Sequence, residues 1–360
     1  MRAAFWTVKL VVMEPLGHLI DTSRRDLHGP SADPRSQFAA GSIARLRRGF
    51  CVPTGVWSGL ETDDRFRLTL AAHALANPGV VFCGETALFL HGVPTVKAPL
   101  TVDVATSTTS RLGVRPSTFD VRGESASARQ ARERGSHQIR RHHHDTIKSI
   151  AVGEFEAVPL ADALAEVLAT AKFARALTVA DGVLRRQPDV PLLDRAAVAD
   201  AIAALPHRSH RARAERIALL ARSGAESPGE SVGRALMLLF GFPEPMLQAE
   251  HFDQLGFVGR TDYYWGDVEG NRAVTAPGKL EPVGEFDGWG KYFRTELTHG
   301  EDPREIIRRE KKRENRLLGL NHPVLRLDWS DLERPAQFRA KLIQMGLRPA
   351  SSAAVADKRA

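Results

Sequence analysis

Three carboxylates in the last third of the chain have types and spacing that suit a divalent metal ion. Asp262 stands directly before Tyr-Tyr-Trp, and Glu285 and Asp287 lie two residues apart in and just after a predicted strand, 283–286. Residues two apart in an extended strand face the same side of a sheet, and an acid inside an aromatic strand is costly unless it is paired or faces a cleft. Because hard cations prefer carboxylate oxygens, we expect a site for Mg²⁺ or Mn²⁺ with Asp262 and Glu285 as ligands.

Two further charged groups stand near these acids along the chain. Ser227-Pro228-x-Glu230 predicts the start of a helix, with serine at the cap and glutamate three residues on. Helix capping already explains Glu230, so a role beside a metal would be additional. Lys291 follows Asp287 by four residues and is a candidate for stabilising charge on a phosphoryl group.

A strongly basic segment follows. The run DPREIIRREKKRENRLLGL predicts a helix, and the run HPVLRLDWSDL predicts a strand that returns to the sheet. Four basic residues cluster on one side of that helix, namely Arg309, Lys312, Arg313 and Arg316. The pattern is typical of a solvated, salt-bridged helix, and contacts with nucleic-acid phosphates would also fit it.

The first part of the chain contains a second group of arginines. Residues 42–48 predict a short basic helix that Gly49 ends before an extended segment. A basic helix followed by a β-hairpin is typical of a winged helix-turn-helix. Arg45, Arg47 and Arg48 are therefore candidates for DNA contact, although arginine runs are more often solvated surfaces.

Three consecutive histidines, His142 to His144, raise the alternative of a second metal site. Neighbouring side chains of an extended segment face opposite sides, so at most two of the three would share an ion. Asp145 is the one potential ligand that follows them closely. A polar strand or loop is the favoured interpretation.

The composition limits the class of protein. The chain has 360 residues, 43% hydrophobic and 26% charged, as in ordinary globular proteins. No uncharged apolar run reaches about 18 residues, so we expect no membrane span. Lys and Arg number 50 against 43 acids, and the net charge of +7 favours a polyanionic partner such as DNA.

Cysteine usage and the first residues bear on the compartment. Cys51 and Cys83 are too few for a disulfide framework or a four-cysteine zinc site, which favours the cytoplasm. Residues 1–13 resemble a weak signal peptide, but Lys9 interrupts the apolar run, and a start at Met13 is an alternative explanation.

Composition also divides the chain. We expect an α/β, multidomain protein with the following parts: a winged-helix-like region at 14–100, an α/β then helical domain at 101–222, a third domain at 223–345 and a disordered tail at 346–360.

Over about residues 225–335 the chain resembles the PD-(D/E)XK nuclease superfamily, and within it the branch of very-short-patch repair endonucleases. The strings that carry the resemblance are ESPGES, the strand of Asp262, VGEFDGWGKY, REKKRENRL and VLRLDW. It implies a restriction-endonuclease-like αβββαβ domain that hydrolyses phosphodiester bonds. Asp262 and Glu285 match its metal-ligand positions, Asp287 a further polar position, and Glu230 the helix acid. Asp287 stands where the superfamily usually has lysine, which leaves the cationic position, here Lys291, open.

The first 200 residues more loosely resemble AbiEi-like antitoxin proteins, which implies a winged helix joined to an α/β domain. Two functions therefore stay open. One is a DNA-binding, metal-dependent endonuclease. The other is a non-catalytic, antitoxin-like transcriptional regulator, with a toxin as one conceivable partner, that uses the nuclease fold as a binding module.

Overall fold

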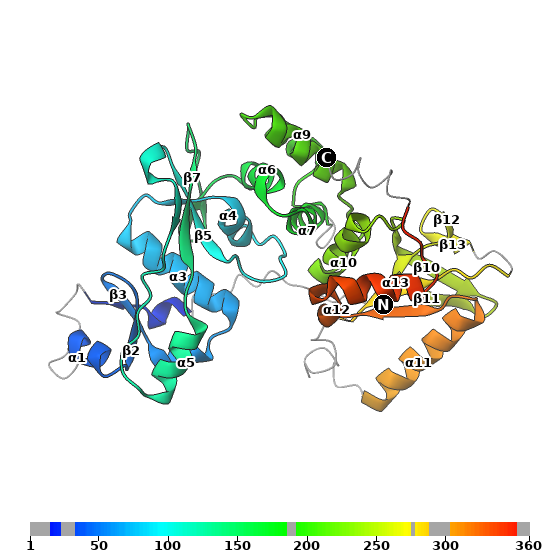
Figure 1. Cartoon of the computed structure of the whole chain (residues 1–360), viewed down its shortest axis with the longest axis horizontal. Coiled ribbons are helices and arrows are strands. Elements are labelled where there is room, and N and C mark those ends of the chain that lie inside the picture. Colours follow the sequence, from blue (N-terminus) through cyan, green and yellow to red (C-terminus); the bar gives the residue numbers. More distant parts are fainter. Residues whose placement is uncertain (1–14, 23–32, 186–191, 275–277, 288–302, 351–360) are drawn as a thin grey trace. The chain divides into compact units, whose positions relative to one another are not determined.

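The computed structural model describes residues 15–22, 33–185, 192–274, 278–287 and 303–350. The fold is mixed α/β with three sheets, as expected from the sequence (Figure 1). The chain forms two compact units. The N-terminal unit comprises residues 1–169 and 196–211, and the C-terminal unit comprises residues 170–195 and 212–360.

The N-terminal unit begins with a three-stranded sheet of order β1-β3-β2. After a 3₁₀ turn at Pro15–His18, its strands are β1 (Ile20–Asp21), β2 (Ile43–Arg47) and β3 (Phe50–Pro53). The helices around it are α1 (Pro34–Ala39), α2 (Thr54–Gly59), α3 (Thr62–Ala76) and α5 (Ala126–Arg134).

The helix predicted over residues 42–48 is wrong, because these residues form strand β2. Gly49 lies in the turn to β3 with φ of +91°, a conformation that glycine adopts without steric cost. Ala44 and Leu46 of the strand pack against Trp57 of α2. Tertiary packing and the glycine turn therefore override the local sequence pattern that favoured a helix.

A six-stranded sheet of order β6-β7-β5-β4-β9-β8 completes this unit. Its strands are β4 (Val81–Phe82), β5 (Thr101–Thr106), β6 (Gly113–Arg115), β7 (Gln138–His143), β8 (Ile150–Val152) and β9 (Phe155–Ala157). Helix α4 (Gly84–Leu90) connects β4 to β5, a 3₁₀ turn at Thr109–Arg111 connects β5 to β6, and α5 connects β6 to β7. Helix α6 (Leu160–Thr170) follows β9. The boundary expected at residue 100 falls inside this sheet, because β4 pairs with β5.

Three helices follow α6 along the chain. They are α7 (Phe173–Leu184), α8 (Arg195–Ala203) and α9 (Arg208–Leu220). Helix α7 belongs to the C-terminal unit, so the boundary expected at residue 222 is also displaced. The cause is a buried ion pair between Asp181 of α7 and Arg234 of the next helix, α10 (Pro228–Leu239).

The C-terminal unit is built on a six-stranded sheet of order β12-β13-β10-β11-β14-β15. Its strands are β10 (Met246–Asp253), β11 (Gly256–Tyr264), β12 (Asp267–Glu269), β13 (Arg272–Val274), β14 (Val283–Phe286) and β15 (Val324–Leu327). The basic helix α11 (Pro303–Gly319) lies between β14 and β15 in the chain, and α12 (Trp329–Glu333) and α13 (Pro335–Gln344) follow. The strand 283–286 and the basic helix agree with the sequence analysis.

Helices cover both faces of this sheet. Tyr263 and Phe286 point toward the core shared with α10, α12 and α13, which includes Phe338. Tyr264 points to the opposite face, where it packs with Leu317 of α11. Among the described residues, none of the helices combines the length and the apolar character needed to cross a bilayer.

Candidate metal and phosphate site

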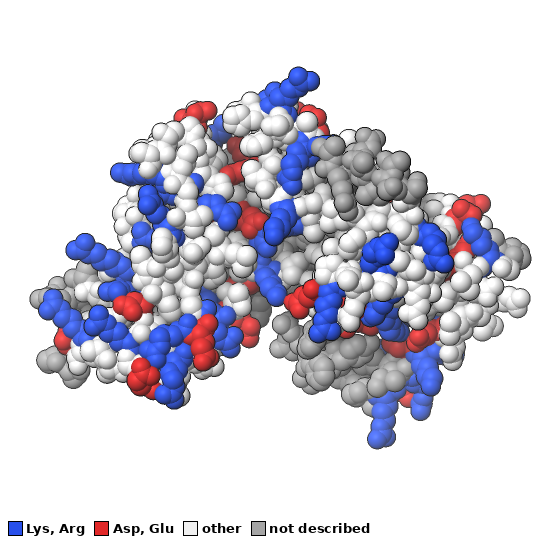
Figure 2. All heavy atoms as spheres, in the orientation of Figure 1, with Lys and Arg blue, Asp and Glu red and all other residues white. Residues whose placement is uncertain are grey.

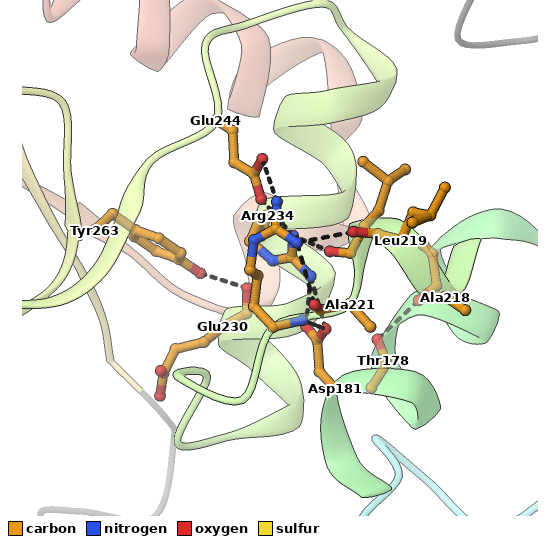
Figure 3. Close-up of polar contacts among 12 residues, drawn as sticks. Thr178, Asp181, Ala218, Leu219, Ala221, Glu230, Arg234, Glu244 and Tyr263 are labelled. Carbon is orange, nitrogen blue, oxygen red and sulfur yellow. Dashed lines mark hydrogen bonds and ion pairs between the residues drawn. The ribbon is translucent and has the colours of Figure 1, made fainter. Parts of the chain in front are cut away.

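Glu230 is held at the start of α10 by its own capping contacts. The Ser227 hydroxyl donates to Glu230 Oε1 at 2.8 Å and accepts from the Glu230 amide at 3.2 Å, and the Glu226 amide donates to Oε2 at 2.8 Å. The cap predicted from the sequence is therefore present. Tyr263 of β11 donates its hydroxyl to the Glu230 carbonyl at 2.8 Å, which fastens the first turn of α10 to the sheet (Figure 3).

Asp262 and Glu285 occupy opposed positions of neighbouring strands. The antiparallel register pairs Tyr263 with Gly284, so the preceding residue of β11 faces the following residue of β14. Opposed residues of an antiparallel pair project from the same face of a sheet. The Phe286 amide also donates to Asp262 Oδ2 at 2.7 Å, which holds the half-buried Asp262 carboxylate against β14.

Gln248 links the acids, and the sequence analysis did not identify it. Its side-chain amide donates to Asp262 Oδ1 at 3.0 Å and to Glu230 Oε2 at 3.3 Å. Gln248 lies in β10 with φ of +54°, a region that residues other than glycine seldom adopt. The hairpin register places it beside Asp262, because Leu247 pairs with Tyr263. The one indication of Gln248 in the sequence is its place in the segment that pairs with the strand of Asp262.

Burial and the charge of Asp262 raise the pKa of two neighbouring carboxylates, Glu230 and Glu285. Burial, and after it the charge of Asp262, raises the pKa of Glu230 to about 7. Burial also raises the pKa of Glu285, against the opposing effect of Arg313 and Arg326, and Asp262 adds to the rise. A cation is stabilised in a region where one carboxylate raises the pKa of its neighbours in this way.

The carboxylates do not form a ready three-ligand cage. Among the described residues, three potential ligand atoms lie within 4.8 Å of one another at a single place, Cys83, His144 and Glu166 of the N-terminal unit. The three acids singled out from the sequence, Asp262, Glu285 and Asp287, are thus brought to neighbouring strands, but among the described residues they do not surround one ion position. Gln248 lies between Glu230 and Asp262, and arginine side chains form ion pairs with the Glu285 carboxylate.

Both oxygens of Glu285 face guanidinium groups. Arg313 Nη2 of α11 lies 2.5 Å from Oε1, and Arg326 Nη1 of β15 lies 3.4 Å from Oε2. Arg326 also lies 3.2 Å from Asp287 Oδ2, so Asp287 joins the group through Arg326. The site therefore places acids of β11 and β14 beside cations of α11 and β15.

The four basic residues expected on one face of α11 fall into two pairs that point in different directions. Arg313 and Arg316 turn toward the sheet, where Arg316 pairs with Asp253 of β10 at 2.5 Å. Arg309 and Lys312 are exposed. Figure 2 shows lysine and arginine side chains projecting from the position of α11, at the lower right of the view. Lys291 lies outside the described residues.

The three arginines of the N-terminal hairpin also differ from one another. Arg45 pairs with Asp120 at 2.6 Å, and Arg48 is exposed. Both line an open pocket of about 550 Å³. Arg47 is half-buried, and its guanidinium lies 2.5 Å from His73 Nδ1. The irregular register of β2 between Arg45 and Arg47 accounts for their different directions. Two of the three arginines, not all three, thus share one surface.

The chain matches no family model, and searches of curated proteins and of solved structures also yield no match. What the site does is therefore argued from its own geometry.

Proposed function

We propose that the chain is a DNA-binding protein whose C-terminal unit is a metal-dependent, endonuclease-like domain. The observation that carries the proposal is the opposed placement of Asp262 and Glu285 on neighbouring strands, with Glu230 joined to Asp262 through Gln248. The order α10, β10, β11, β14, α11, β15 is the αβββαβ order of a restriction-endonuclease-like fold, to which the short β12–β13 hairpin adds.

The placement of Asp262 and Glu285 suits the binding of a hard cation, and a structural role alone does not explain it as well. Their carboxylates lie on one sheet face, at the side covered by the basic helix α11. Mg²⁺ is usually held by one or two protein carboxylates together with water and substrate phosphates. When bound there, Mg²⁺ or Mn²⁺ supplies polarisation of a phosphoryl oxygen and hydroxide near neutral pH.

The remaining residues have roles that follow from their contacts. Gln248 and the Phe286 amide fix the orientation of Asp262. Arg313 and Arg326 hold Glu285 and stand where they would face a phosphate brought to the acids. Asp287 keeps Arg326 in place, and Lys291 remains a proposed cation beside the phosphoryl group.

DNA binding is the second part of the proposal. The exposed Arg309 and Lys312 of α11 and the exposed Arg48 at the turn of the β2–β3 hairpin are candidates for phosphate contact. In a winged-helix arrangement this hairpin would be the wing. Because such contacts release counterions, DNA affinity would fall steeply as salt rises.

The pairing of Glu285 with two arginines favours one other function. The two arginines already compensate the negative charge of both Glu285 oxygens. This is expected of a nuclease-like fold that binds a partner rather than cleaving it. The second candidate is therefore a non-catalytic, antitoxin-like regulator, which would bind DNA and, if the resemblance extends so far, a toxin.

A cleavage assay separates the two functions. Purified protein is incubated with DNA and with RNA, with Mg²⁺, with Mn²⁺ and with a chelator, beside Asp262→Asn, Glu285→Gln and Glu269→Gln. Glu269 is an exposed acid in β12 of the same sheet and is the matched control. We expect metal-dependent cleavage by the wild type and by Glu269→Gln, and a loss of about 100-fold or more for the two site variants.

Equal cleavage by the wild type and Glu285→Gln would show that the proposed site is wrong. Binding of DNA without cleavage of any substrate, with either metal, would favour the regulator.

A further inference from the structure

A group of metal-ligating side chains lies in the N-terminal unit, apart from the acids of the C-terminal unit. Cys83 follows β4, His144 follows β7, and Glu166 lies in α6. Their ligand atoms, the thiol sulfur, a ring nitrogen and a carboxylate oxygen, all lie within 4.8 Å of one another. Three segments far apart in the sequence thus meet at one point.

One buried atom of this group makes no hydrogen bond. His144 Nε2 has no hydrogen-bond partner, and its ion-pair partner, Glu166 Oε2, lies 3.7 Å away. A buried polar atom without a hydrogen bond is costly, and an unseen ion is one of its ordinary explanations.

Neighbouring residues orient the group. His142 Nδ1 lies 2.9 Å from Glu166 Oε1, and His142 Nε2 lies 3.2 Å from Asp103 Oδ1. The Gly84 amide donates to Glu166 Oε2 at 3.1 Å. Ligating carboxylates in metal sites are commonly hydrogen-bonded by such outer partners, which fix their direction.

The donor set selects a class of ion. One thiolate, one imidazole and one carboxylate are the ligands of zinc sites, and three protein ligands leave a fourth position for water. With bonds of roughly 2.0–2.3 Å, ligand atoms around zinc lie about 3.3–3.8 Å apart. Side-chain rotations that close the present group by about 1 Å would therefore be needed.

The exposure of two of the three side chains would also let an ion reach the group. Cys83 is fully buried, whereas the side chains of His144 and Glu166 are 21% and 16% exposed. An ion would enter from the side of His144 and Glu166 and reach the sulfur last.

We propose that Cys83, His144 and Glu166 form a site for Zn²⁺ or a similar divalent transition-metal ion. The site ties the β4–α4 junction and the end of β7 to α6, and it is independent of the oxygen-ligand site around Asp262 and Glu285.

Cobalt spectroscopy tests the proposal on the full chain, freed of metal with a chelator. Co²⁺ is added to the wild type, Cys83→Ser, His144→Ala and Cys51→Ser. Cys51 is the other cysteine and is also buried in this unit, so it is the matched control. His144→Ala removes the proposed imidazole ligand and leaves the thiol of Cys83 in place. Circular dichroism checks that each variant folds.

We expect a thiolate-to-cobalt absorption band at one equivalent in the wild type and Cys51→Ser, and none in Cys83→Ser. Zn²⁺ should displace the Co²⁺, and His144→Ala should bind Zn²⁺ at least about tenfold more weakly. Co²⁺ bound only around Asp262 and Glu285 gives no thiolate band, because that site offers only oxygen ligands. Absence of the band in the wild type, or Zn²⁺ affinity unchanged in His144→Ala, would overturn the proposal.

Discussion

Arg234 of α10 holds Asp181 of α7 in a fully buried ion pair. One guanidinium nitrogen, Nη2, lies 2.7 and 2.8 Å from the two carboxylate oxygens, and both side chains are 0% exposed (Figure 3). Arg234 Nη1 also donates to Glu244 Oε1 at 2.9 Å and to the Leu220 carbonyl at 2.8 Å. The helix that carries Glu230 is thus anchored to α7 by a charge network rather than by apolar packing alone.

Breaking this pair from one side should strongly destabilise the C-terminal unit. Asp181→Ala leaves Arg234 buried with its charge uncompensated on that side, and a loss of about 3–5 kcal/mol in the free energy of unfolding is expected. Replacing both residues, as Asp181→Leu with Arg234→Met, should cost less than Asp181→Ala, because no buried charge remains. Urea unfolding measures each change.

The exposed pair Glu305–Arg308 on α11 is the control for this prediction. Its side chains are 61% and 76% exposed, and Glu305→Ala should change the free energy of unfolding by less than about 1 kcal/mol. A double variant as unstable as Asp181→Ala would contradict the account based on charge burial.

Local signals in the sequence predicted much of the C-terminal unit. The cap at Ser227 and helix α11 depend on residues close together in the chain, and the structure confirms both. The strand that carries Glu285 also follows from its local pattern.

What the sequence analysis missed depends on contacts between distant residues. Residues 42–48 became a strand because they pack on Trp57. The pairing of Arg313 with Glu285 joins residues 28 apart, and no spacing rule indicates it. The histidine run was weighed only against its neighbours, whereas His144 meets Cys83 and Glu166 from other elements.

Gly229 should be essential to the position of Glu230. A Cβ atom there would lie 2.1 Å from the Phe286 ring, so Gly229→Ala must push α10 away from β14. Overpacking of this kind typically costs about 1–3 kcal/mol. We expect lower stability by urea unfolding and weaker Mn²⁺ binding by calorimetry, because Glu230 would move relative to Asp262.

Gly319, at the end of α11, provides the control, since a Cβ atom there meets nothing within 4 Å. Gly319→Ala should leave stability unchanged or slightly raised. If Gly229→Ala proved as stable as the wild type, the close contact between α10 and β14 would be refuted.

Arg313 should oppose metal binding in the absence of DNA. The Arg313 guanidinium forms an ion pair with Glu285 Oε1. A metal ion that binds this carboxylate must therefore displace the guanidinium or bind close to its positive charge. Arg313→Gln should therefore bind Mn²⁺ about three- to tenfold more tightly, which corresponds to roughly 1 kcal/mol. Calorimetry at low salt measures the change.

Lys312→Gln is the matched control, because it removes the same charge from an exposed neighbour on the same helix. Its Mn²⁺ affinity should rise much less. Equal gains in both variants would mean that general electrostatics, not the contact with Glu285, governs the site.

His73 should make the N-terminal unit less stable in acid. Burial, and then the charges of Arg47 and Arg141, lower the pKa of His73 to about 3, whereas an unfolded histidine has a pKa of about 6.5. Below about pH 6.5 His73 binds a proton in the unfolded chain, whereas in the folded chain it binds this proton only near pH 3. The stability is therefore fully present above about pH 6.5 and falls as the pH drops, by up to about 1.4 kcal/mol per pH unit.

His73→Gln should reduce this slope by about one proton between roughly pH 4 and pH 6, because glutamine takes up no proton. Its side-chain oxygen still offers Arg47 an acceptor in place of His73 Nδ1. Urea unfolding at several pH values measures the slope, with His207→Gln as a control at an exposed position. If His73→Gln kept the wild-type slope, Arg47 would not be facing a neutral, buried imidazole. The placement of Arg47 in the interior, rather than on the surface proposed for DNA, would then have to be withdrawn.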